Sequence, residues 1–136
     1  MLEELRDQYL GEPLGHFASE LLIEVQADNN ILQDLADRLG STGGLKKVAA
    51  WLDEKVSRTK LKHGGDDFGT FEALELLALG IQGKLALWRA LAAISPGDTR
   101  LSHLNLAQLL SRAETQHTQA EERRLEAAHN AFRPFS

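Results

Sequence analysis

The stretch that decides the fold runs from Phe71 to Ile94 and reads FEALELLALGIQGKLALWRALAAI. Of its 24 residues, 17 are Phe, Ala, Leu, Ile or Trp and two are Gly. A helix at the surface of a soluble domain has one apolar stripe, whereas a helix that is apolar on every side is buried on every side. The pattern therefore predicts a helix that is covered all round, by the rest of the chain, by a partner subunit, or by both.

The whole chain has the composition of one soluble globular domain. Its 136 residues are 43% hydrophobic and 26% charged, which is ordinary for a domain with a sizeable core. The net charge of −5, without any basic block, argues against binding to nucleic acid or to an anionic membrane surface. Because cysteine is absent, disulfides, thiolate metal sites and cysteine nucleophiles are excluded. We expect a single domain over residues 1–136.

Neither a targeting segment nor a membrane span is predicted. The first residues lack a basic region followed by an apolar run, so they do not read as a signal peptide. Lys84 and Arg89 interrupt the apolar stretch, and its longest uncharged part is Leu76–Gly83. A membrane-spanning helix needs about 20 mainly apolar residues. We therefore expect a soluble, cytoplasmic protein.

Clusters of glycine and proline divide the chain into helices, and the period-two alternation of strands is missing. The predicted helices are a short opening one over about 2–10 and long ones over 13–39, 44–62, 70–94 and 98–132. Thr42, Thr70 and Asp98 are the predicted N-cap residues. Short loops make neighbouring helices antiparallel. The predicted fold is therefore all-α: an antiparallel up-down-up-down four-helix bundle with a short extra N-terminal helix.

Apolar residues spaced three and four apart predict the inward face of each helix. On helix 98–132 the predicted seam consists of Leu106, Leu110, Ala113, His117 and Ala120. Trp51 and Trp88 are predicted to anchor the core. The predicted stripe of helix 13–39 consists of Phe17, Leu21, Leu22, Val25, Ile31, Leu32, Leu35 and Leu39.

Small residues on helix 70–94 bear on how this helix is covered. Gly80 and Gly83 lie in its middle, where a glycine costs about 1 kcal/mol relative to alanine. Close approach of another backbone offsets such a cost. Two arrangements are open: a monomer in which the opening helix and helix 98–132 shield it, and a homodimer in which its second face meets its symmetry mate. We favour the homodimer.

Two Glu-x-x-His patterns lie on the last helix, one formed by Glu114 and His117 and the other by Glu126 and His129. Residues three apart share a helix face, so that a carboxylate and an imidazole can reach one metal ion. The two patterns are twelve residues apart, which corresponds to about 120° around the helix and about 18 Å along it. They cannot share a metal ion.

With these patterns, the chain resembles the ferritin-like carboxylate bundles, since four helices of suitable length cover nearly all of it. The resemblance implies a Glu from the first long helix, here Glu20 or Glu24, and a Glu from the third, here Glu75 or Glu72. It also implies a second Glu-x-x-His on helix 44–62, where no His follows Glu54 at that spacing. The resemblance therefore implies the fold rather than a two-metal oxidase centre.

Two sites for a single divalent ion, such as iron, zinc or manganese, remain as hypotheses. The predicted ligands at the end of the bundle near Pro13 are Glu20, Glu75, Glu126 and His129. The second site lies at mid-height, level with Asp28 and Lys84, and uses Glu114 and His117. The alternatives are that the first set marks solvated helix ends, and that His117 is a partly buried imidazole hydrogen-bonded to Asp28 or Asn29.

No catalytic motif and no cofactor signature emerges from the sequence. The leading prediction is a non-catalytic association or scaffold protein that acts as a homodimer through helix 70–94, without a nucleic-acid or membrane partner. The alternative is a ferritin-like metal-binding protein. A pocket for a small ligand between the helices is a third possibility, which the sequence leaves open.

Overall fold

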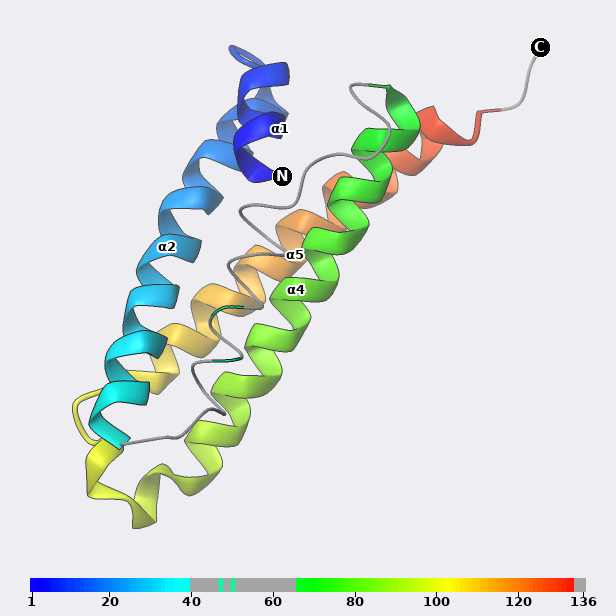
Figure 1. Ribbon diagram of the computed structural model, residues 1–136. Helices are drawn as coiled ribbons and strands as arrows, with labels where there is room; N and C mark the ends of the chain where they lie inside the picture. The colour runs from blue at the N-terminus through cyan, green and yellow to red at the C-terminus, as the bar shows by residue number, and fades with distance from the viewer. Residues whose placement is uncertain (40–46, 48–49, 51–65, 134–136) are drawn as a thin grey trace.

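The computed structural model describes residues 1–39, 47, 50 and 66–133, and the regular structure within these ranges is helical (Figure 1). The helices are α1 (Leu2–Gln8), α2 (Pro13–Leu39), α4 (Asp67–Ile94) and α5 (Leu106–Ala131). Two short 3₁₀ turns, η2 (Ser95–Gly97) and η3 (Thr99–Leu101), connect α4 to α5. The all-α prediction is therefore confirmed. Most of the predicted helix 44–62, together with Thr42 and Trp51, lies outside the described residues.

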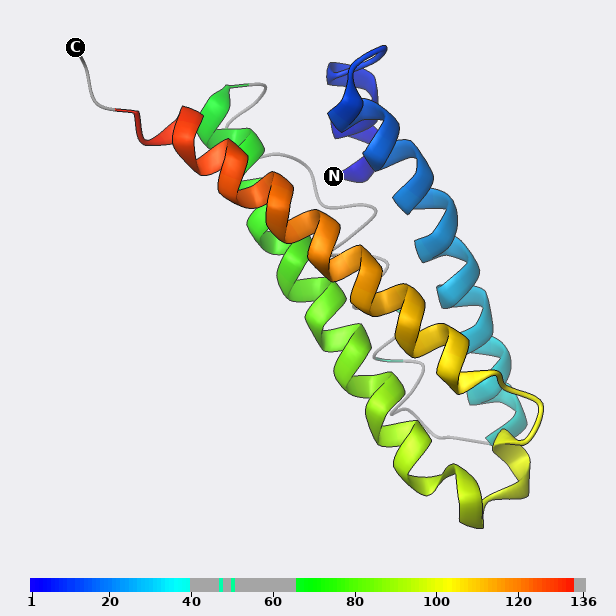
Figure 2. The same cartoon turned by 180° about the vertical axis from the view of Figure 1, so that it is seen from behind.

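Helices α4 and α5 lie side by side along their lengths and run in opposite directions, as both views show (Figures 1 and 2). Helix α1 folds back beside the first turns of α2. Helix α2 runs in the same direction as α4 and contributes side chains to the same core. Residues of the first halves of α2 and α4 therefore meet residues of the second half of α5.

Two glycines shape the turn that places α1 against α2. Gly11 has a φ of +83°, in the left-handed region that side chains other than glycine rarely adopt. Gly15 packs so closely on the backbone of Tyr9 that a Cβ atom there would overlap the Tyr9 carbonyl. The Tyr9 hydroxyl shares a hydrogen bond of 2.7 Å with Oγ1 of Thr70, which ties this turn to α4.

The core consists of two apolar clusters that follow one another along the helices. The first lies near the N-terminus and contains Met1, Leu2, Leu5, Phe17, Ala18, Leu21, Leu22, Val25, Ala73, Leu74, Leu77, Ala78, Ile81, Ala120 and Ala127. The second contains Leu32, Leu35, Leu85, Trp88, Leu91, Leu101, Leu106, Leu109 and Ala113. Trp88 is fully buried, which confirms its prediction as a core anchor.

The predicted N-cap of α4 is wrong by one turn. The helix begins at Asp67, and its N-cap is Asp66, whose Oδ1 accepts a hydrogen bond from the backbone N–H of Gly69 at 2.6 Å. Thr70 lies inside the first turn and is buried. Its hydroxyl is used for the contact with Tyr9 rather than for capping. Asp is as good a cap as Thr, so the sequence did not separate the two.

Helix α5 also begins later than predicted, at Leu106 instead of residue 98. Its N-cap is Asn105, whose Oδ1 accepts a hydrogen bond from the N–H of Gln108 at 3.1 Å. Asp98 caps the short turn η3 and binds the Arg100 guanidinium at 2.9 and 2.7 Å. The Pro96-Gly97 pair is followed by this local turn, which delays the start of the long helix.

The inward face of α5 passes through Leu109 and Gln116 rather than through Leu110 and His117 as predicted. Leu109 is 6% exposed and Gln116 is 2% exposed, whereas Leu110 and His117 are half-buried. A seam that alternates steps of three and four can begin with either step. The observed face takes the step of three first, from Leu106 to Leu109. At these two positions the inward residue therefore comes one place earlier in the sequence than predicted.

Helix α4 is buried on one side and exposed on the other. Its outward residues include Leu79, which is 56% exposed, and Ile94, which is 54% exposed. Within one chain, the described residues therefore leave one side of α4 exposed, and whether the rest of the chain or a partner subunit covers that side stays a prediction. By length and composition, Asp67–Gly97 could cross a membrane, a property that core helices of soluble proteins share.

Candidate functional site

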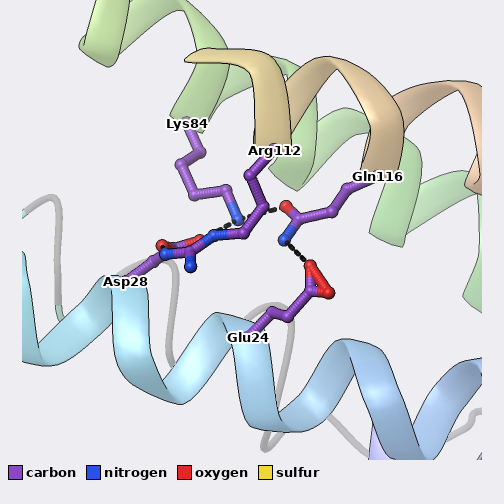
Figure 3. A network of polar contacts seen from close by, with 5 residues as sticks. All are labelled: Glu24, Asp28, Lys84, Arg112 and Gln116. Carbon is purple, nitrogen blue, oxygen red and sulfur yellow. Dashed lines mark hydrogen bonds and ion pairs between the residues drawn. The ribbon is translucent and has the colours of Figure 1, made fainter. Parts of the chain in front are cut away.

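A layer of polar side chains separates the two apolar clusters (Figure 3). Asp28 from α2 is 2% exposed, Lys84 from α4 is 3% exposed, and Gln116 from α5 is 2% exposed. Arg112 and Glu24 approach the same place from α5 and α2 (Figure 3). These five residues are called the polar layer below. They come from all three long helices that the structure describes.

The contacts within the polar layer pair every buried charge. The Lys84 ammonium donates hydrogen bonds to Oδ2 of Asp28 at 2.7 Å and to Oε1 of Gln116 at 2.5 Å. The Arg112 guanidinium pairs with the other oxygen of Asp28. Gln116 then donates through Nε2 to Oε1 of Glu24 at 2.7 Å. Two cations and two carboxylates thus balance, as buried charges require.

Burial lowers the pKa of Lys84 from its usual value of 10.5, and the nearby charge and hydrogen bond of Asp28 only partly oppose this effect. A lysine with a lowered pKa is a better nucleophile or base than an ordinary one. A nucleophile must also reach its substrate, and Lys84 is 3% exposed with its ammonium bound to two side chains. The layer is therefore suited to fixing the register of α2, α4 and α5 rather than to catalysis.

The lowered pKa of Lys84 makes a prediction about pH. Between this lowered pKa and 10.5, the unfolded chain binds more protons at Lys84 than the folded chain does. The contribution of Lys84 to the free energy of unfolding therefore increases as the pH rises through this window. We expect the difference in unfolding free energy between the native sequence and Lys84→Met to grow from pH 7 toward pH 10 in urea titrations.

The exposed Lys47 provides a matched control, because Lys47→Met removes a lysine that is in contact with solvent. A difference for Lys84→Met that stays flat, or that shrinks as the pH rises, would show that burial does not lower the pKa of Lys84.

The structure distributes the four predicted ligands of the first metal site among separate contacts. Glu20 pairs with His16 at 3.1 Å, and Glu75 pairs with Arg124 at 3.4 Å. Glu126 lines a cavity of about 270 Å³ between the start of α2, the start of α4 and the end of α5. His129 borders a different depression.

Within the described ranges, no three His, Asp or Glu side chains lie together as a metal site requires. This statement does not extend to sites that include residues outside those ranges. Metal binding therefore stays a prediction, to which the described residues add no support.

At the level of the predicted mid-height site, the structure brings together side chains other than Glu114 and His117. Asp28 and Lys84 do meet there, and the side chain of α5 that joins them is Gln116. His117 is half-buried beside it, and Glu114 faces Arg89 at 4.0 Å on the surface. The signal that the sequence analysis missed is the polar residue next to His117, which follows Leu109 and Ala113 at helical spacing.

The second notable feature is the exposed side of α4. Its exposed residues from position 75 onward, called the outer face of α4 below, are Glu75, Leu79, Gln82, Gly83, Ala86, Arg89, Ala90, Ala93 and Ile94. Apolar and small residues recur along it in steps of four and three, from residue 79 to residue 93. This spacing is that of a seam between two packed helices. Polar residues follow one flank of the seam at positions 75, 82 and 89.

Comparisons of this chain with protein-family models, with curated proteins and with solved structures gave no match. The two features of the described residues that bear on function are the polar layer and the outer face of α4. The Lys84 ammonium and the Asp28 carboxylate are inaccessible and paired, while Nε of Arg112 is the one buried side-chain atom of the layer without a hydrogen-bond partner among the described residues, so the outer face of α4 is the candidate functional site.

Proposed function

We propose that this protein is a non-catalytic association module that forms a homodimer through the outer face of α4. The observation that supports the proposal is a helix-packing seam that one chain leaves in contact with water. Leu79 is 56% exposed in the middle of that seam, with small residues following at helical spacing. Apolar residues that gather on one exposed helix face are a feature of interaction sites, whereas singly scattered ones are not.

The proposal includes the bundle topology. In an up-down-up-down bundle with a short N-terminal helix, the first and third long helices run in the same direction and the fourth runs against them. The directions of α2, α4 and α5 agree with this topology (Figures 1 and 2). The bundle then supplies a rigid support for the outer face of α4, because the polar layer holds these helices in one register.

The proposal also includes a soluble, cytoplasmic protein. Helix α5 lies beside α4 along its length and exposes Glu114, Thr115, Thr118, Gln119 and Glu122. A bilayer that surrounded α4 would also contact this polar side of α5, and charged side chains in contact with lipid are costly. A protein partner in water therefore explains the exposed apolar residues on the outer face of α4 better than a lipid bilayer does.

The substitution Leu79→Glu tests the proposed homodimer. We expect it to weaken dimerisation at least about a hundredfold, which corresponds to about 2.8 kcal/mol, because each dimer would bury two new charges. Glutamate is a good helix former, so the monomer should keep its helical content. Light scattering after size-exclusion chromatography, over a range of concentrations, measures the effect, and circular dichroism checks the fold.

Leu125→Glu is the matched control, because Leu125 is 51% exposed on α5, outside the outer face of α4. We expect it to leave the mass unchanged. If Leu79→Glu and the native sequence both have the mass of a dimer, the interface lies elsewhere on the molecule. A native sequence that is monomeric at all concentrations would remove the proposal.

A further inference from the structure

We infer that two copies of the chain pair through the outer face of α4 in antiparallel orientation, with the two-fold axis at Gln82. Glu75 of each copy then faces Arg89 of the other copy. This inference rests on the proposed homodimer and specifies its geometry. It is carried by the pattern of charge along the face, by the sizes of the seam residues, and by the neighbouring charges on α5.

The first argument is charge complementarity. Glu75 and Arg89 each lie seven residues from Gln82 and on the same flank of the seam. In an antiparallel pair, residues equally far from the axis face each other, so an axis at Gln82 places opposite charges together twice. In a parallel pair with aligned ends, Glu75 faces Glu75 and Arg89 faces Arg89. Like charges in facing positions disfavour that orientation.

The second argument is the size of the facing side chains. Residues of the seam lie on a different part of the helix surface from the flanking residues 75, 82 and 89, so their facing pairs are centred one residue earlier, at position 81. The seam then places Leu79 of one copy against Gly83 of the other, and Leu76 against Ala86. Leu79 is exposed and Leu76 is half-buried in the single chain, so both have surface left to bury. Large residues then fill the space above small ones, as close packing requires. The parallel pair would place leucine on leucine and glycine on glycine.

A shift of the antiparallel pair by one heptad loses these matches. In one direction the shift sets Arg89 against Gln82 and moves Glu75 beyond the end of the partner helix. In the other direction it sets Glu75 against Gln82 and leaves Arg89 opposite an apolar residue. Only the register centred on Gln82 satisfies both charges of each copy.

The third argument comes from α5, which contributes a charge of the opposite sign beside each of the two residues. Within one chain, Arg124 lies 3.4 Å from Glu75, and Glu114 lies 4.0 Å from Arg89. Both contacts are long, and the side chains of Glu75 and Arg89 are 48% and 63% exposed. In the antiparallel pair, Arg89 of one copy faces Glu75 of the other at two places. At each place four side chains then form a row of alternating charge: Glu114 and Arg89 from one copy, followed by Glu75 and Arg124 from the other.

Cysteine cross-linking tests this geometry cleanly, because the chain contains no cysteine of its own. Gln82→Cys places both new thiols at the axis, where we expect most of the protein to form a disulfide-linked dimer under mild oxidation. Glu75→Cys alone should stay uncross-linked, because its two thiols would lie about 21 Å apart along the helices, and a disulfide needs Cα atoms within about 7 Å. Arg89→Cys alone should behave in the same way.

An equal mixture of Glu75→Cys and Arg89→Cys provides the positive counterpart. Its mixed dimer brings the two thiols together and keeps one Glu75–Arg89 pair, so we expect the mixed disulfide to dominate. Mass spectrometry of the oxidised mixture identifies it, because the two chains differ in mass.

The outcomes separate the inference from the proposed function. Glu75→Cys or Arg89→Cys dimers that cross-link with themselves as readily as Gln82→Cys would indicate a parallel pair. If the native chain is dimeric but none of its cysteine variants forms these disulfides, the interface lies in another register or on another face. Either result overturns the inference while the homodimer stands, whereas a monomeric native sequence overturns both.

Discussion

Asp28→Ala is expected to lower the free energy of unfolding by about 3–5 kcal/mol, since it leaves a buried cation without its carboxylate. Asp28 is the shared partner of Lys84 and Arg112, and Lys84 is 3% exposed. Arg112 is partly exposed and can turn toward water, whereas the Lys84 ammonium is held inside the core. The loss is measured by urea unfolding followed by circular dichroism.

Two comparisons give this result its meaning. The double variant Asp28→Leu with Lys84→Met removes both buried charges and should lose less stability than Asp28→Ala alone, because an apolar pair of similar volume often replaces a buried ion pair without loss. Asp34→Ala breaks an exposed pair with Arg38 on the same helix and should cost less than about 0.5 kcal/mol. If Asp28→Ala cost no more than Asp34→Ala, the polar layer would not be buried as described.

Trp88→Ala is expected to lower the free energy of unfolding by about 3–5 kcal/mol, because it removes the largest side chain of the second apolar cluster and leaves a cavity. Trp88 is 0% exposed and lies among residues of α2, α4, α5 and the η3 turn. The same denaturation experiment measures the loss. Circular dichroism is the suitable signal, since the substitution itself removes a fluorophore.

Trp88→Phe is the matched variant, and it should cost less than Trp88→Ala, because a phenyl ring leaves a smaller cavity than a methyl group does. The indole Nε1 of Trp88 finds no hydrogen-bond acceptor among the residues that the structure describes, so phenylalanine keeps part of the packing and loses no described hydrogen bond. Equal and small losses for the alanine and phenylalanine variants would mean that this cluster is not closely packed around the indole.

The sequence predicts the helices well where local signals agree. Pro13 begins α2 and Ile94 ends α4 as expected, because breakers and apolar periodicity mark the same residues. The apolar stripe of α2 was also predicted, and its residues from Phe17 to Val25 are buried. Trp88 was predicted as a core anchor and is one. These predictions depend on local spacing, which a sequence carries directly.

The polar layer was harder to predict, because it depends on which of two adjacent residues on α5 faces inward. Gln116 and His117 lie next to each other, and the seam allows either of them. Helix lengths placed His117, Asp28 and Lys84 at one level, but the sequence did not predict a polar layer there. The choice of Gln116 is made by partners on two other helices, which only the folded arrangement brings to it.

The apolar character of Phe71–Ile94 was interpreted as burial on every side, and the described residues of one chain bury only one side. Gly80 faces the core and Gly83 faces outward, so the two glycines serve different surfaces. Composition alone does not separate a helix that is central in one chain from a helix that is shared between two. The high exposed fraction of Leu79 favours a helix that is shared between two copies.

Sedimentation equilibrium of the unmodified protein tests the central claim most directly. The proposed homodimer predicts a mass of about 30 kDa, twice the 15.0 kDa of one chain, with dissociation on dilution. A mass of 15.0 kDa at every concentration, with the outer face of α4 open to water, would contradict the account.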